Sequence, residues 1–82
     1  MPRYFFHLID GSDIRDEVGE QLPDFAAARR SALLILGEIL NARSERFWQD
    51  GSVRVVVDCE GRTVIEVEAR DMSPRPARLS VV

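Results

Sequence analysis

Residues 24–47 read DFAAARRSALLILGEILNARSERF, and this stretch is the only long helical pattern in the chain. Asp24 is a suitable N-cap because its carboxylate can accept hydrogen bonds from the free N–H groups of the first helical turn. A rotation of about 100° per residue gathers a stripe of apolar side chains, which we predict to face the core. The stripe consists of Phe25, Ala28, Ala32, Ile35, Leu36, Ile39, Leu40 and Phe47.

Two residues interrupt the polar side of this predicted helix. Leu34 points away from the apolar stripe, and Gly37 lies mid-helix, where glycine costs about 1 kcal/mol relative to alanine. One interpretation is a single exposed leucine beside a tolerated glycine. The other is a surface that another helix approaches closely. Leu34 and Gly37 therefore form the first candidate interface.

Short strand patterns lie on both sides of the helix. Residues 3–9, 53–58 and 63–70 are rich in β-branched and aromatic side chains, and residues 13–18 form a weaker return strand. Gly61, in the turn between the last two strands, is expected to have a positive φ. The order of elements predicts an α+β fold with two layers, β-β-α-β-β. We expect about four mainly antiparallel strands, with the one long helix on one face of the sheet.

Alternation along the predicted strands separates an inner face from an outer face. The inner face is almost wholly apolar and carries Tyr4, Phe6, Leu8, Val53, Val55, Val57, Thr63, Ile65, Val67 and Ala69. The outer face mixes arginines and glutamates with Phe5, His7, Val56 and Val64. This face is too apolar for an ordinary solvent-exposed surface, so these four residues form the second and preferred candidate interface.

The length and the cysteine count favour self-association. A chain of 82 residues forms one domain, here residues 1–72, and buries too little surface to be very stable alone. One cysteine and one histidine allow neither an intrachain disulfide nor a zinc site. Small domains without such links are often stabilised by oligomerisation. We therefore expect a homodimer and no cofactor.

The remaining composition bears on location and partners. The start of the chain lacks a secretory leader pattern, and the apolar run at residues 32–37 is too short to span a bilayer, so we expect a cytoplasmic protein without a membrane partner. The net charge of −3 argues against broad electrostatic binding to nucleic acid. Residues 73–82 contain two prolines and are interpreted as a flexible or partner-binding tail.

Residues 10–20 contain five acidic side chains and one arginine. The glycine in Asp-Gly-Ser-Asp is at the wrong position for an EF-hand calcium loop, and no helix precedes it. We therefore interpret this segment as a solvated acidic turn.

His7 is the only residue that could act in histidine-based acid–base catalysis. A catalytic triad also needs a nucleophile and an orienting acid, and no serine here lies in a nucleophile-elbow motif. We expect a half-exposed sheet residue and no enzymatic activity. A small hydrolase that uses His7 with an acidic neighbour such as Asp10 is kept as an alternative.

Four segments together resemble a known family. They are MPRYFFHLIDG at residues 1–11, DEVGEQLPD at 16–24, AAARRSA at 26–32 and EGRTV at 60–64. Their combination resembles a family of small bacterial proteins of unknown function that begin with an Arg-Tyr-Phe-Phe strand. The resemblance extends to Asp71 and implies a compact cytoplasmic domain, without catalytic residues to assign.

The order strand, turn, strand, Leu-Pro-Asp and helix also resembles the antitoxin partners of small RNase toxins, at the level of fold. Those proteins share an acidic domain made of a sheet and a helix. This chain lacks their usual extra strand before the helix and any appended DNA-binding unit. The alternative function is thus an antitoxin-like protein whose acidic residues 10–20 bind a small basic partner.

Overall fold

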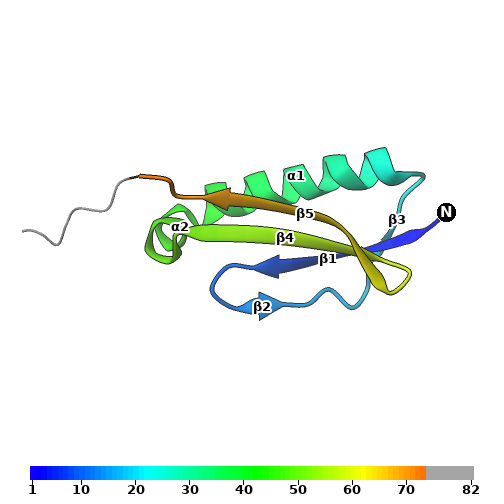
Figure 1. Ribbon diagram of the computed structural model, residues 1–82. Helices are drawn as coiled ribbons and strands as arrows, with labels where there is room; N and C mark the ends of the chain where they lie inside the picture. The colour runs from blue at the N-terminus through cyan, green and yellow to red at the C-terminus, as the bar shows by residue number, and fades with distance from the viewer. Residues whose placement is uncertain (74–82) are drawn as a thin grey trace, which may run out of the picture.

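The computed structural model describes residues 1–73 and shows one sheet with two helices on one side of it (Figure 1). The predicted α+β class, with a mainly antiparallel sheet under a helix, is confirmed. Ser73 apart, the predicted tail lies outside the described residues. The elements are β1 (Arg3–Ile9), β2 (Asp13–Ile14), β3 (Glu20–Gln21), α1 (Phe25–Ala42), α2 (Ser44–Asp50), β4 (Ser52–Cys59) and β5 (Arg62–Arg70).

The sheet is built on two long antiparallel pairings of β4. Its strand order is β2-β1-β4-β5, and β3 pairs with the same side of β1 as β2 does. Phe6 faces Val57 across the first long pairing, and Val55 faces Val67 across the second. Strand β5 therefore forms one edge of the sheet, and β2 and β3 share the other.

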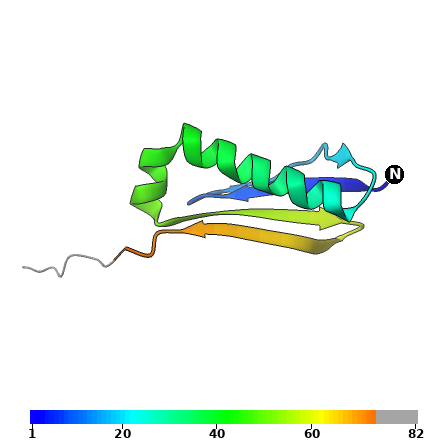
Figure 2. The same cartoon turned by 90° about the horizontal axis from the view of Figure 1, so that it is seen from above.

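The core lies between α1 and the inner side of β4 (Figure 2). Val53, Val55 and Val57 are almost completely buried, as the alternation of the sequence predicts. Ala28 and Ala32 are also fully buried, so the helix lies close to the sheet where its side chains are smallest. Tyr4, Leu36 and Ile65 complete the buried cluster.

Two local predictions are confirmed at the ends of elements. Asp24 Oδ1 accepts a hydrogen bond from the N–H of Ala27 at 2.9 Å, as expected of an N-cap. Glu60 and Gly61 have φ values of 53° and 79° in the tight turn between β4 and β5. Two successive positive φ angles match the twist of a two-residue hairpin turn, so both strands stay in one sheet.

The predicted helix over residues 24–47 holds as far as Ala42 and is wrong only near its C-terminal end, because the chain breaks at Arg43. Arg43 has φ −128° and ψ 46°, which ends α1 and begins α2. Its Nη1 lies 2.7 Å from Oδ2 of Asp10, whose side chain is only 4% exposed. A buried carboxylate requires a cationic partner, and this ion pair holds Arg43 at the corner between the helices. Asp10 is distant in sequence, so helical periodicity could not indicate the break.

Phe25, which was predicted to face the core, and Trp48 are both about half exposed. Phe25 is 46% exposed, because the first turn of α1 lies beside the β5 edge, and the guanidinium of Arg29 lies 5.7 Å from its ring centroid. Trp48 lies in α2, is 55% exposed and contacts Phe47 edge to face. No helix within residues 1–73 combines the length and the apolar character needed to cross a bilayer.

Two strand assignments also need correction. The second strand, expected over residues 13–18, is divided into the short β2 and β3, with an irregular loop between them. Thr63 was assigned to the inner face. In the structure Val57 faces Ile65 and Asp58 faces Thr63, so β5 has one extra residue at this point. This β-bulge places the hydroxyl of Thr63 2.8 Å from Asp58 on the outer side.

Adjacent helical leucines provide a test of the predicted helix phase. Leu36 is 8% exposed, so Leu36→Ala should lower the free energy of unfolding by roughly 2–5 kcal/mol. Leu34 is 63% exposed, so Leu34→Ala should change it by less than about 0.5 kcal/mol. Urea unfolding of both variants measures the difference. Equal effects would show that the orientation of α1 is wrong.

Candidate functional site

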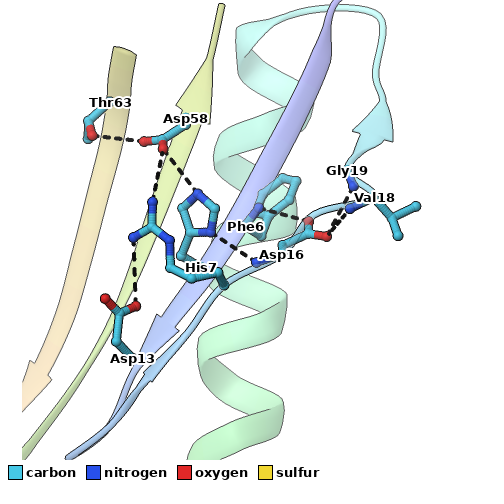
Figure 3. A network of polar contacts seen from close by, with 9 residues as sticks. Phe6, His7, Asp13, Asp16, Val18, Gly19, Asp58 and Thr63 are labelled. Atoms are coloured by element: carbon cyan, nitrogen blue, oxygen red, sulfur yellow. Dashed lines mark hydrogen bonds and ion pairs between the residues drawn. The ribbon is translucent and has the colours of Figure 1, made fainter. Parts of the chain in front are cut away.

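His7 is buried on the outer side of β1 and is held by hydrogen bonds at both ring nitrogens (Figure 3). The backbone N–H of Asp16 donates to Nδ1 at 3.0 Å, and Nε2 lies 3.0 Å from Oδ2 of Asp58. Since Nδ1 accepts, the ring proton must lie on Nε2 and is donated to Asp58. The side chain is 5% exposed, so the expectation of a half-exposed His7 is wrong.

The carboxylate of Asp16 organises the loop that covers His7. Its Oδ1 accepts from the backbone N–H groups of Val18 and Gly19, both at 3.0 Å. Its Oδ2 accepts from the backbone N–H of Phe6, also at 3.0 Å. Phe6 lies in the middle of β1, so the carboxylate takes the place of a neighbouring strand there. This capture explains why the return strand divides into β2 and β3.

Asp58 connects the same network to the neighbouring strands. Its Oδ1 accepts from the hydroxyl of Thr63 on β5 at 2.8 Å, and Arg15 Nη2 lies 3.9 Å from its Oδ2. The contacts thus extend from the covering loop through β1 and β4 to β5. We call the set His7, Arg15, Asp16, Asp58 and Thr63 the His7 network.

The pKa values of both carboxyl groups lie below the ordinary 3.8. Burial alone would raise the pKa of Asp16, but the hydrogen bonds from three backbone N–H groups outweigh it. For Asp58, the hydrogen bond from Thr63 lowers the pKa most, burial opposes it, and the bond to His7 lowers it further. Both carboxylates are therefore stabilised in their charged form by the fold.

The order of groups in the His7 network differs from that of a catalytic triad. In a triad the imidazole lies between the carboxylate and the hydroxyl and takes a proton from the hydroxyl. Here the carboxylate of Asp58 lies between the imidazole of His7 and the hydroxyl of Thr63. Asp10, the acid proposed for a His7-based hydrolase, instead pairs with Arg43. The network connects the covering loop to β1, β4 and β5.

The acidic segment is partly neutralised by contacts within the chain. Asp10 pairs with Arg43, Asp13 lies 3.7 Å from Arg15, and Asp16 binds backbone N–H groups. Among the described residues, no group of three or more histidine, cysteine, aspartate or glutamate side chains could hold a metal ion. Most residues of the segment are exposed, as expected of a solvated turn, but the carboxylates of Asp10 and Asp16 serve the fold.

The other edge of the sheet is open. No strand within residues 1–73 pairs with the outer side of β5. Beside it lies a groove of about 620 Å³ between α1 and β5. Its lining is mainly apolar, with one charge of each sign, and consists of Phe25, Arg29, Leu33, Val64, Ile65, Glu66 and Val67. Leu33 is 61% exposed, so this rim of α1 presents apolar surface to solvent.

The structure places the residues of the candidate interfaces at several locations. Gly19 has φ 75° and lies so close to Phe5 that a Cβ there would come within 2.8 Å of the ring, so the covering loop shields Phe5. Val56 is partly exposed, and Val64 lies on the groove. Leu34 is exposed, and a Cβ at Gly37 would meet open space. Helical periodicity did not identify Leu33 and Phe25 as exposed apolar residues, because their exposure depends on where the sheet ends.

Acid titration tests the role of Asp16. A folded-state pKa below the ordinary 3.8 contributes stability that is complete above pH 3.8 and lost as the pH falls through the folded value. Wild-type stability should therefore decrease below pH 3.8. Asp16→Asn should lower stability at neutral pH by roughly 1–3 kcal/mol, because one backbone donor faces an amide N–H₂ group. The variant should also lose less stability on acidification.

Glu17 provides the matched control, since it is exposed and forms no hydrogen bond or ion pair within residues 1–73. Glu17→Gln should leave both the neutral stability and its acid dependence unchanged in urea unfolding at several pH values. An Asp16→Asn variant with wild-type acid dependence would contradict the role given to its carboxylate.

Comparison with known proteins identifies the family of the chain. No curated protein and no solved structure matches it. The family model described as Domain of unknown function (DUF6894) matches residues 3–70, which includes every helix and strand described above. The chain therefore belongs to the DUF6894 family, a domain family of unknown function.

Proposed function

We propose that this protein is a non-enzymatic interaction domain that self-associates as a homodimer in the cytoplasm. The observation that carries the proposal is the open β5 edge beside an apolar groove. An edge strand exposes unpaired backbone N–H and C=O groups and readily pairs with another chain. A reducing compartment is compatible with Cys59, which is the only cysteine and is not involved in a disulfide.

The two edges of the sheet differ in a way that directs association to β5. At the β1 edge, β2, β3 and the Asp16 carboxylate occupy the backbone groups. Asp58 and Thr63 hold the covering loop in place, so adding a strand there would require breaking the His7 network. Strand β5 has no such cover within the described chain.

A second copy of the chain fits the groove by its chemistry. Leu33 and Phe25 supply exposed apolar surface, which association would remove from water. Arg29 and Glu66 line the same groove and carry opposite charges. A two-fold axis beside the groove would bring the exposed Leu33 side chains of the two copies towards each other, because an isologous interface uses one patch twice. The groove is thus complementary to itself.

The absence of catalytic activity is part of the proposal and is supported by the geometry of His7. Both ring nitrogens are engaged and the side chain is buried, so His7 has no free lone pair to accept a proton from a substrate. The antitoxin-like alternative has less support, because internal contacts already engage the carboxylates of Asp10 and Asp16.

Two adjacent leucines allow a matched test of self-association. Leu33 and Leu34 are 61% and 63% exposed, so a glutamate at either position should be tolerated by the isolated domain. They point about 100° apart around the helix, and only Leu33 lines the groove. Sedimentation equilibrium should show a wild-type dimer, a Leu33→Glu monomer and a Leu34→Glu dimer.

Each other outcome has a definite meaning. A wild-type monomer at tens of micromolar, the concentration of ordinary weak dimers, would refute self-association. Dissociation by Leu34→Glu but not by Leu33→Glu would move the interface to the side of α1 that contains Leu34. Circular dichroism of both variants checks that each remains folded.

A further inference from the structure

We propose that protonation of His7 releases the covering loop, residues 15–19, from the sheet, so that the closed edge of β1 opens in mild acid. The loop joins β2 to β3 and lies beside β1 (Figure 3). This device is separate from the proposed dimer interface, because β5 forms the opposite edge of the sheet. It depends on an imidazole whose surroundings favour a positive charge while its hydrogen bonds exclude one.

The hydrogen bonds of the closed loop require a neutral His7. The N–H of Asp16 donates to Nδ1 at 3.0 Å, and the single ring proton on Nε2 is donated to Asp58. An imidazolium carries a proton on both nitrogens and cannot accept a hydrogen bond. A proton on Nδ1 would therefore face the N–H of Asp16, and one of the two donors must move. His7 is held in β1 by pairing with β4, so the loop is the part that moves.

The charges on this side of the sheet favour the imidazolium. They come from the loop, β4 and β5 and belong to Arg15, Asp16, Arg54, Asp58 and Glu66. Arg54 and Glu66 lie 3.5 Å apart and offset each other. Two carboxylates then remain against the guanidinium of Arg15, which is 53% exposed and also lies 3.7 Å from Asp13. An excess of nearby negative charge favours the protonated ring.

Burial opposes this charge only while the loop is closed. His7 is 5% exposed, and a buried imidazolium loses hydration. Opening admits water to the ring and removes Arg15 and Asp16 together, because both belong to the loop. Asp58 stays on β4, 3.0 Å from Nε2, as the partner of the imidazolium. The open state therefore accommodates the proton that the closed state excludes.

Little apolar surface holds the loop in place. Of its five residues only Asp16 and Gly19 are partly buried, and Val18 is 77% exposed. The flanking strands β2 and β3 contain two residues each. A further contact, from Arg3 Nη1 to the carbonyl of Val18 at 2.8 Å, is exposed to solvent. The closed position thus depends mainly on the polar contacts of Asp16.

Two hydrogen bonds join Asp16 to β1, and both would be lost on opening. Its N–H donates to His7, and its Oδ2 accepts from the N–H of Phe6 at 3.0 Å. The bonds to Oδ1 come from within the loop and can survive its movement. Opening would therefore free the N–H of Phe6 and uncover the ring of Phe5, which the closed loop shields.

The direction of the pH dependence follows from proton uptake. The open state binds one proton more than the closed state, so the equilibrium constant for opening rises by up to about tenfold per pH unit as the pH falls. Histidine is the side chain that ordinarily changes charge between about pH 8 and pH 5. The pKa values of Asp16 and Asp58 lie below 3.8, so both carboxylates stay charged throughout this range.

Nuclear magnetic resonance of the wild-type protein tests the proposal. His7 is the only histidine, so its ring nitrogen signals are unambiguous. As the pH falls from about 8 to 5, both ring nitrogens should become protonated. With the same midpoint, the protection factors of the Phe6 and Asp16 amides against hydrogen exchange should fall by up to about tenfold per pH unit. The amide of Val57, in the middle of the sheet, should keep its protection.

His7→Asn is the matched control, because its amide oxygen can accept the N–H of Asp16 but does not titrate. Protection of Phe6 and Asp16 in this variant should not depend on pH. A pH-dependent loss there would assign the effect to another group and overturn the proposal. In the wild type, a protonated ring with both amides still protected would show that the closed loop accommodates the imidazolium. A ring that stays neutral at the lowest pH would show that burial prevails. Either wild-type result overturns the proposal, even if the variant does not fold.

Discussion

The structure depends on the capture of three backbone N–H groups by one carboxylate, that of Asp16. Without this acceptor, the N–H of Phe6 would be left unpaired in the middle of β1, and buried backbone donors are rarely left in that state. Binding Asp16 also fixes the loop so that its own N–H reaches Nδ1 of His7. The burial of His7, the division of the return strand and the cover over Phe5 all follow from this local arrangement.

This arrangement gives the sheet two unequal edges. One edge is filled by β2, β3 and an aspartate side chain, and is secured to β4 and β5 through Asp58 and Thr63. The other edge is β5, which no strand within residues 1–73 pairs with on its outer side and which is bordered by the apolar rim of α1. Natural proteins usually protect open edges with charges, bulges or a partner. Here β5 has charges and a bulge, but Leu33 and Phe25 beside it are exposed, which favours a partner.

The sequence predicts the parts of the fold that depend on local periodicity. Alternation assigned the buried valines of β4 to the core, and the pattern after Asp24 identified the N-cap and the inner side of α1. Contacts between distant residues were missed for physical reasons. The ion pair of Asp10 with Arg43 ends α1, and the bonds of Asp16 divide a strand. The two partners of each contact lie at least ten residues apart in sequence. Local periodicity therefore could not indicate either contact.

The candidate site illustrates the same limit. The sequence marked Phe5 and His7 as an outward-facing patch, because alternation shows which face a residue occupies but not what covers that face. It assigned Val64 to the outer face, whereas Val64 packs against the core beside the groove. It also passed over Leu33, whose exposure depends on the sheet ending at β5. The preference for self-association is therefore retained, while its proposed location has moved from the outer sheet face to the groove.

Amide hydrogen exchange at two concentrations, below and above dimer formation, tests the central claim of one closed and one open edge. The N–H of Phe6 should be protected equally at both concentrations, because Asp16 of the same chain accepts its hydrogen bond. The outward N–H groups of β5 between Ile65 and Arg70 should exchange rapidly in dilute protein and slow down at the higher concentration. Exchange in β5 that is independent of concentration would contradict the account.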